Sequence, residues 1–424
     1  MPCFKNKAVL ITAGLVFLQN TLVFAAPVEL SLEQSIEMAL KNNPSIQIAA
    51  EDKARSVWGV DEAKAGKMPS VSLGSRYNYQ DQGQSQGQDK DSFCNSISMN
   101  WKLYNGGGTE AQIDQAKLGV KTADLNVIKA KQQLKQETTT GYYSVLETKN
   151  MVAVNEESVS NLQTHLTIVQ AKYEAGVVAK SEVLRSEVEL ANAEQNLIKA
   201  QNQYDLAVSS LLNTMNMDAG TEIQLAGELK YEADARTLTD ALSQARENRP
   251  EIAQAKVSVD SAAQGVKIAE SNKRPSVSLS ASTGWNDTLL PNDDQNWSVG
   301  ASASWNIFDA GVTKSKVNQA QSSLNKAKLQ SKQTQDTVEQ EVRQSYLNMK
   351  EAEKRLQTTD VAANKAKEDL YIAQETYRAG VGTNLDVLDA QLALTQAKTN
   401  HVQALYDYNV NKASLDKAIG LQAE

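Results

Sequence analysis

The chain contains two copies of one structural unit, and this duplication limits its possible folds more than any other feature. Pro44 and Pro250 lie in similar contexts, LKNNPSIQIA and RENRPEIAQA, 206 positions apart, and Pro69 and Pro275 show the same offset. Further along, the offset is 204, where KYEAGVVAKSEVLRSE resembles TYRAGVGTNLDVLDAQ. Similarity of this extent indicates that one unit occurs twice along the chain.

Each copy predicts the same order of elements: a helical segment, a β-hairpin, a very long helix and a returning helix. The first repeat spans 26–217, with a β-hairpin at 69–105 and a helical hairpin at 109–215. The second spans 237–424, with a β-hairpin at 275–308 and a helical hairpin at 312–419, and 218–236 forms a connector. The first helical segment, 32–67, is expected to bend at Pro44, because proline removes a backbone donor.

The predicted strands alternate apolar with small polar residues. Val71, Leu73, Tyr77 and Tyr79 share one face of the first strand, and the other strands show the same period of two. Strands of about ten residues with this pattern are typical of outer-membrane barrels. The edge of a soluble sandwich is the alternative. The polar loops 81–91 and 287–295 are expected to face the cell exterior.

Four strands cannot close a barrel, and open strand edges are not tolerated in lipid. Closure therefore requires several copies of the chain. Two copies would supply eight strands, whose interior side chains fill, whereas three would supply twelve and leave a lumen. The long helices carry a coiled-coil pattern, and about 65 residues at 1.5 Å each give a rod of roughly 100 Å. Because no bilayer is that thick, the rods must project into an aqueous compartment.

The N-terminus predicts export. Residues 1–25 combine Lys5 and Lys7 with an apolar stretch and a small-residue cleavage site before Ala26, as in a signal peptide. No other stretch has about 18 apolar residues, so any membrane insertion must use strands. The formal net charge of −8, without a basic cluster, argues against nucleic acid as a partner.

No motif for chemistry is present. NGGGT at 105–109 lacks the Lys-Ser/Thr ending of a phosphate-binding loop, so a flexible joint between strand and helix is expected. His165 and His401 are the only histidines and show no metal-ligand spacing. We therefore expect no enzyme activity, no cofactor and no metal. The predicted fold is a mixed α and β membrane protein, with long α-helical coiled-coil hairpins and four transmembrane β-strands per chain.

The signal peptide, the doubled β-hairpin and helical hairpin, and the turn YRAGVGTNLDVLDA together resemble the TolC family of outer-membrane efflux proteins. The resemblance implies a homotrimer with a twelve-stranded β-barrel and an α-helical tunnel. It implies a passive exit duct of a tripartite efflux or type I secretion system, in contact with outer-membrane lipid and with its helices in the periplasm. The implied partners are a periplasmic adaptor (membrane fusion) protein and an inner-membrane transporter, whose docking opens the duct.

The family resemblance also implies a gate. Asp386 and Asp389 match acidic residues that ring the closed tunnel end in the family, and Glu182 takes the corresponding place in the first copy. Tyr377 and Tyr173 match tyrosines near that gate. Acidic residues in a first helical turn also favour the helix dipole, and the tyrosines would suit a hairpin core equally well.

One position departs from the family pattern. Some members carry a basic residue two positions after the turn glycine, where this chain has Gly382. A gate locked by an ion pair at that position is therefore not expected. A trimeric autotransporter-like adhesin with a coiled-coil stalk is the alternative function, but that class groups its strands at the C-terminus. A soluble adaptor does not account for two lipid-suited strand pairs.

Overall fold

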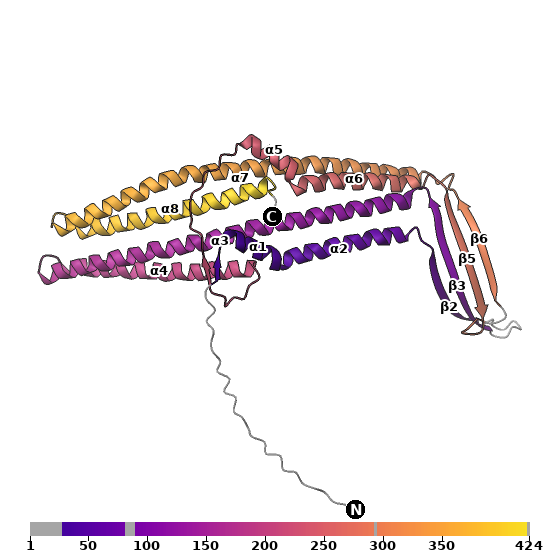
Figure 1. Ribbon diagram of the computed structural model, residues 1–424, viewed down its shortest axis with the longest axis horizontal. Coiled ribbons are helices and arrows are strands. Elements are labelled where there is room, and N and C mark those ends of the chain that lie inside the picture. The colour runs from indigo at the N-terminus through magenta and orange to yellow at the C-terminus, as the bar shows by residue number, and fades with distance from the viewer. Residues whose placement is uncertain (1–27, 81–89, 292–294, 422–424) are drawn as a thin grey trace, which may run out of the picture.

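The molecule is a long rod of helices with a four-stranded sheet at one end (Figure 1). The computed structural model describes residues 28–80, 90–291 and 295–421. The predicted signal peptide lies outside these residues, as do most of the predicted outer loop 81–91 and part of the loop 287–295.

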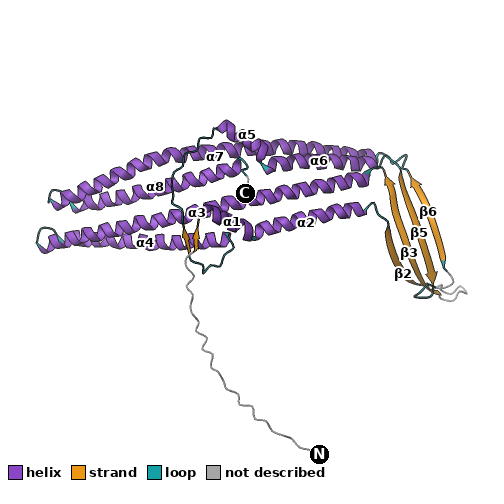
Figure 2. Cartoon of the chain, in the orientation of Figure 1, coloured by secondary structure: helices purple, strands orange, loops and turns teal. Residues whose placement is uncertain are grey.

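The two copies match element for element (Figure 2). The first copy consists of α1 (Leu32–Asn42), α2 (Pro44–Ala65), β2 (Ser70–Gln80), β3 (Lys90–Asn105), α3 (Gly108–Glu174) and α4 (Lys180–Thr214). The second consists of α5 (Leu238–Asn248), α6 (Pro250–Ser271), β5 (Ser276–Asn286), β6 (Asn296–Ser304), α7 (Val312–Arg378) and α8 (Asn384–Ala418). Paired helices have equal lengths of 11, 22, 67 and 35 residues.

The segment expected as one bent helix over 32–67 is two separate helices. Asn43 is extended, with ψ of 129°, because a residue before proline avoids the helical region. Its side chain then accepts a hydrogen bond from the Ser45 backbone N–H and starts α2, whose first residue is Pro44. Proline is well tolerated at that position, because the N–H it lacks has no partner in the first helical turn.

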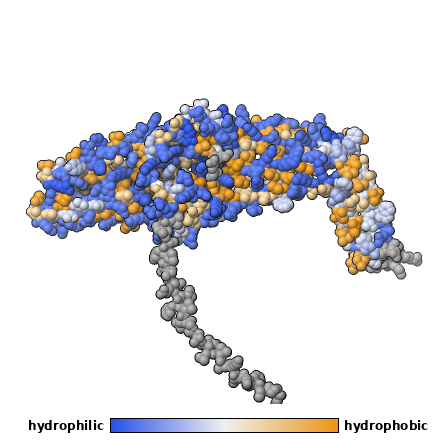
Figure 3. Space-filling model, viewed as in Figure 1, coloured by the Kyte–Doolittle hydropathy of each residue, from blue (hydrophilic) through white to orange (hydrophobic). Residues whose placement is uncertain are grey.

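The sheet is antiparallel with the order β2-β3-β5-β6, so within the described residues β2 and β6 form its two edges. One face carries serines paired across strands, with Oγ–Oγ distances of 2.9 Å for Ser72–Ser98 and for Ser278–Ser302. The opposite face exposes large apolar side chains, seen as the orange patch over the sheet in Figure 3. The sheet is therefore polar on one side and suited to lipid on the other.

The helices pack side by side along the rod. Near the sheet the neighbours run in the order α2, α3, α6 and α7, and towards the far end in the order α4, α3, α8 and α7. Apolar seams hold these helices together, and Leu134, Val145, Leu211, Val342 and Leu415 are nearly fully buried. None of the helices in the described residues is long and apolar enough to cross a membrane.

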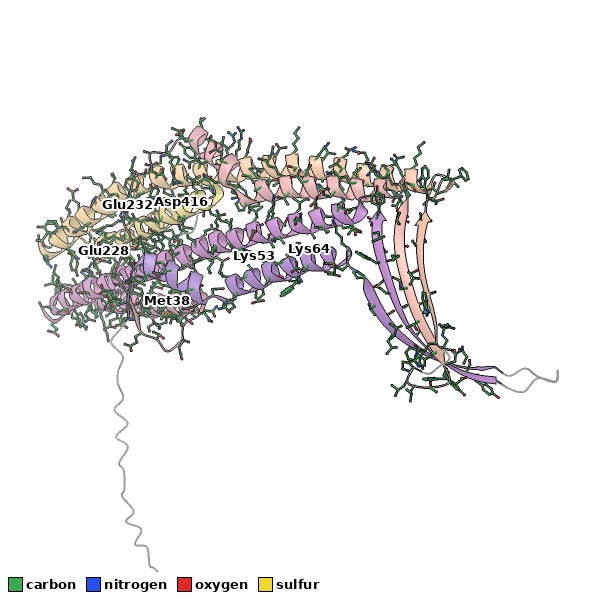
Figure 4. All side chains as sticks on the ribbon, turned by 45° about the vertical axis from the view of Figure 1, so that its right-hand side comes forward. Met38, Lys53, Lys64, Glu228, Glu232 and Asp416 are labelled. Carbon is green, nitrogen blue, oxygen red and sulfur yellow. The ribbon has the colours of Figure 1, made fainter. Side chains whose placement is uncertain are left out.

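The connector between the copies forms a strap around the middle of the rod. Its strand β4 (Ile223–Leu225) pairs in parallel with β1 (Val28–Leu30), an interaction that the sequence pattern does not predict. Further along the strap, the Tyr408 hydroxyl donates to the Glu232 carbonyl at 2.6 Å. Arg236 pairs with Asp416 at 2.6 Å, so the strap is fixed to α8. Figure 4 shows Glu232 and Asp416 together at this position.

Candidate gate at the hairpin tips

The two helical hairpins turn at the end of the rod farthest from the sheet (Figure 1). Gly176 and Gly380 take positive φ values of 73° and 80°, each two positions after the last residue of α3 or α7. Glycine adopts this left-handed conformation without strain, which allows the long helix to end and the chain to reverse. All five predicted gate residues lie within nine positions of these two glycines.

Asp386 starts α8. Its Oδ2 accepts hydrogen bonds from the Thr383 N–H at 2.8 Å and the Thr383 hydroxyl at 2.7 Å, while the Thr383 hydroxyl accepts from the Asp386 N–H at 3.2 Å. This reciprocal arrangement is a capping box. The hydrogen bonds from Thr383 lower the pKa of Asp386. Asp389 lies one turn further along, and both carboxylates are exposed.

Glu182 has the place of Asp386 in the first copy but a different role. The residue before α4 is Ala179, which has no side chain to cap the helix, so no capping box forms. The Glu182 carboxylate instead accepts a hydrogen bond from the Tyr377 hydroxyl at 3.4 Å. A carboxylate of the first hairpin is thereby linked to a tyrosine of the second.

The two predicted tyrosines lie in different environments. Tyr377 is only 3% exposed, and its ring packs against His165 with 5.1 Å between ring centroids. Lys172 lies over the same ring, 4.1 Å from its centroid, and donates to the Tyr377 carbonyl. Burial, together with the nearby Glu182 carboxylate, raises the pKa of Tyr377 to about 12. Tyr173 is 43% exposed, so only one tyrosine belongs to the contact between hairpins.

A buried polar cluster completes this contact. The Asn384 amide oxygen lies 2.6 Å from His165 Nε2 and accepts from the Ser186 hydroxyl at 3.3 Å. The Asn384 amide nitrogen donates to the Glu182 carbonyl at 3.2 Å. Burial lowers the pKa of His165, so the neutral imidazole is favoured. The cluster ties the start of α8 to both helices of the first hairpin.

The sequence analysis missed His165 as a member of this site, together with Lys172, Ser186 and Asn384. One signal was available, because each of these four departs from the repeat. Their counterparts at an offset of 204 are Asp369, Thr376, Ala390 and Lys180. Such departures indicate positions where the two hairpins meet different surroundings.

The cluster consists of hydrogen bonds and ring contacts between the two hairpin tips. The described residues contain no group of three or more His, Cys, Asp or Glu side chains placed to hold a metal ion. The polar contacts join α3 and α4 of the first hairpin to α7 and α8 of the second, and a relative movement of the hairpins would break them. Exchange of such contacts for water costs little net free energy, typically about 1 kcal/mol for each hydrogen bond.

The fold and the tips together define a class of protein: an elongated membrane channel, with a lipid-suited sheet at one end and hairpin tips at the other. The family model described as "Outer membrane efflux protein" matches residues 35–216 and 241–421. The chain therefore belongs to the outer membrane efflux protein family, and it is an outer-membrane efflux channel with a helical part in the periplasm. The two matched segments follow the internal duplication.

Known proteins are similar over most of the chain. The outer membrane protein TolC of Escherichia coli (strain K12) is 25% identical over 407 residues, covering 92% of this chain and 82% of that protein. The outer membrane efflux protein BepC of Brucella suis is 24% identical, covering 98% and 91%. The crystal structure of VceC from Vibrio cholerae shares the fold, with a TM-score of 0.77 at 19% identity over 93% of this chain and 97% of that one.

These similarities confirm the predicted fold class, function and location. The adhesin alternative is excluded by the family match across both repeats.

Proposed function

We propose that three copies of this chain assemble into a twelve-stranded barrel continuous with a helical tunnel. The observation that carries this proposal is the four-stranded sheet, which is apolar on one face and open at β2 and β6. Open edges in lipid leave backbone groups without hydrogen bonds, so the sheet needs further strands. In this assembly 1–25 is a removed signal peptide, 26–217 and 237–424 are the repeats, and 218–236 is the connector.

The tunnel acts as a passive conduit from the periplasm to the exterior. A periplasmic adaptor and an inner-membrane transporter dock at the hairpin tips, the end farthest from the membrane. The tips suit this role because Val177 and Val381 expose 71% and 81% of their surface at the two turns. The loops 81–91 and 287–295, at the opposite end, face the exterior.

Asp386, Asp389 and Glu182 form the constriction, and Tyr377 holds the resting state through Glu182. Threefold symmetry brings the exposed Asp386 and Asp389 carboxylates of three copies towards one axis. A ring of carboxylates attracts cations and repels anions. Tyr173, which is half exposed, lies at the rim of this region and not in the contact between hairpins.

The gate is tested with the double variant Asp386→Asn and Asp389→Asn in planar bilayers. Asparagine keeps an acceptor oxygen for Thr383, so the start of α8 is preserved while the charge is removed. We expect cation selectivity to fall, and block by trivalent cations on the helical side to weaken about tenfold or more. Asp336→Asn with Asp360→Asn, two exposed acids on the α7 shaft, is the matched control. Native selectivity and block in the gate variant would assign both aspartates to the helix start alone.

The assembly is tested by the mass of the detergent-extracted protein together with its conductance. A trimer that forms pores supports the proposal, and a water-soluble monomer contradicts it. Tags inserted at 81–91 and at 287–295 are expected to react on intact cells. Reaction of the tags only after the outer membrane is broken would show that the loops face the periplasm instead.

A further inference from the structure

Tyr79 of β2 and Trp285 of β5 are equivalent positions of the two copies, yet they differ sharply in exposure. Tyr79 is 61% exposed, whereas Trp285 is only 5% exposed. Both side chains lie on the apolar face of the sheet, the face that also carries Leu73 on β2 and Leu279 on β5. Because most of this face is open, a large ring that is so deeply buried must be covered by another part of the chain.

The residues after β5 fold back over this ring. Asp287 has a left-handed φ of 65°, a conformation that aspartate adopts more readily than most residues. Its N–H donates to the Phe93 carbonyl at 2.7 Å, so the chain turns at this residue. The Thr288 carbonyl then accepts a hydrogen bond from the Trp285 indole N–H at 3.2 Å. We name residues 287–291 the fold-back segment.

A polar side chain on the apolar face holds the fold-back segment in place. Asn95 of β3 lies opposite Ser75 of β2 and Trp285 of β5, so it shares their face of the sheet. Its amide oxygen accepts from the Ser75 hydroxyl at 2.5 Å, and its amide nitrogen donates to the Thr288 carbonyl at 2.7 Å. Asn95 is only 4% exposed. A buried amide without partners would be strongly unfavourable, so these two hydrogen bonds are what allow a polar residue on this face.

The internal repeat shows that this polar pair is specific to the first copy. The counterparts of Ser75 and Asn95 in the second copy are Ala281 and Val299, which lie opposite each other in the β5–β6 pair. Both counterparts are apolar, as the alternation of the strands predicts. The first copy therefore departs from the apolar pattern at the place where the fold-back segment is attached.

The fold-back segment lies close to the level at which the apolar band of the sheet ends. β5 runs away from the helices and ends at the free end of the sheet (Figure 1). From Ser276 to Trp285 it advances nine residues, about 31 Å at 3.4 Å per residue. A strand tilt of about 40° reduces this length to roughly 24 Å along the membrane normal, similar to the apolar band of about 25 Å in outer-membrane barrels. Trp297, which is 78% exposed and lies opposite Thr283 on the same face, is close to this level.

Two adjacent leucines of the fold-back segment are exposed. Leu289 exposes 82% of its surface and Leu290 77%. The Thr288 hydroxyl donates to the Leu290 carbonyl at 2.7 Å, so the backbone that carries both leucines has a defined turn. Large apolar side chains gathered on a surface indicate a contact with another apolar phase. Because the segment is attached to the lipid-suited face of the sheet, the apolar phase beside it is the membrane.

We propose that the fold-back segment is a membrane anchor, in which Leu289 and Leu290 enter the acyl layer of the outer leaflet beside the barrel wall. Asn95 and Trp285 are positioning residues, since they hold the Thr288 carbonyl and contact no lipid through their polar groups. The inference rests on the proposed barrel and its orientation. It adds to them a lipid-binding segment outside the strands.

The anchor is tested with a bimane fluorophore on Leu290→Cys in a Cys94→Ser background, with the protein in phosphatidylcholine vesicles. Lipids with a nitroxide near the start of the acyl chain should quench this probe about threefold more than a probe on Ser302→Cys, because apolar side chains at the interface reach the upper acyl layer. Ser302 is an exposed residue of the serine face and is the matched control. Iodide in the water should quench the two probes in the opposite order.

The role of Asn95 is tested with Asn95→Leu, which removes the amide but keeps the face apolar. Lipid quenching of the probe at Leu290→Cys should then fall about threefold and iodide quenching should rise, since the Thr288 carbonyl loses its shortest hydrogen bond. Ser75→Ala is the matched control, because it removes the other hydrogen bond of Asn95 and leaves the one to Thr288. Unchanged quenching in Asn95→Leu, or an equal change in Ser75→Ala, would overturn the positioning role.

The outcomes separate the anchor from the proposed barrel, because the mass of each sample is measured before the fluorescence. Trimers in which iodide and not lipid quenches the probe at Leu290→Cys would overturn the anchor and leave the barrel intact. Quenching by neither reagent would show that protein covers the segment, which also overturns the anchor. A sample without trimers would overturn the barrel, and the anchor with it, because the segment reaches lipid only from a membrane-inserted sheet.

Discussion

Within the part of the chain that the structure describes, α3 and β3 of the first copy have a neighbour on each side, whereas α7 and β6 of the second copy have a neighbour on one side only. The paired helices have the same lengths, so this difference does not come from local sequence preferences. Under the proposed trimer, the open sides of α7 and β6 are the surfaces that another copy would cover. At the hairpin tips the difference is reversed, because Tyr377 of the second copy is buried and its counterpart Tyr173 of the first copy is exposed.

The largest expected effect is the difference in stability loss between alanine variants of the two tyrosines. Tyr377→Ala removes a ring that is 3% exposed and its link to Glu182, so we expect the tip contact to lose about 3 kcal/mol. Tyr173→Ala, at the equivalent position, should cost less than about 1 kcal/mol. Limited proteolysis at the tips and the frequency of spontaneous opening in bilayers measure both. Equal effects of the two variants would show that the burial difference has no role in the resting state.

A smaller effect compares Glu147 of α3 with its counterpart Glu351 of α7. Burial and the nearby Asp407 carboxylate raise the pKa of Glu147 to about 7. A raised carboxyl pKa means that the protonated side chain is favoured in the fold. The stability it contributes is complete below the unfolded pKa of about 4.3 and is lost as pH rises through about 7.

Glu147→Gln should therefore raise the temperature at which the proposed trimer dissociates in detergent, and the rise should be larger at pH 8 than at pH 6. The screened effect is on the order of 1 kcal/mol, because the side chain is half-buried. Glu351→Gln, an exposed carboxylate paired with Arg355 at 3.0 Å, is the matched control for loss of a carboxylate. A gain from Glu147→Gln that is the same at both pH values would contradict the proposed linkage.

The smallest effect concerns the joint between strand and helix. Gly106 has φ of 69°, and its counterpart Ala310 adopts φ of 51°. A left-handed conformation costs an alanine about 1 kcal/mol, which glycine avoids. Ala310→Gly should therefore raise the thermal unfolding midpoint slightly. Ala379→Gly, where φ is −72°, should lower it, and a lower midpoint for both would indicate that Ala310 is unstrained.

Much of the fold could be predicted because its hydrophobic periodicity extends over long segments and occurs in both copies. The long helices begin and end within about one residue of the expected bounds, and the strands follow the alternation of apolar and polar residues. The bend at Pro44 proved to be a complete break, because Asn43 caps the following helix instead of continuing the first one. The pairing of β4 with β1 could not be predicted, since three-residue strands carry no measurable period.

The sequence by itself determined the duplication, the helix and strand order, the two faces of the sheet and the membership of a channel family. Only the tertiary structure decided which members of each repeated pair make equivalent contacts. Glu182 and Asp386 are equivalent in sequence, yet one accepts from Tyr377 and the other caps its own helix. Local patterns record what a residue prefers, whereas burial and partners depend on which elements pack beside it.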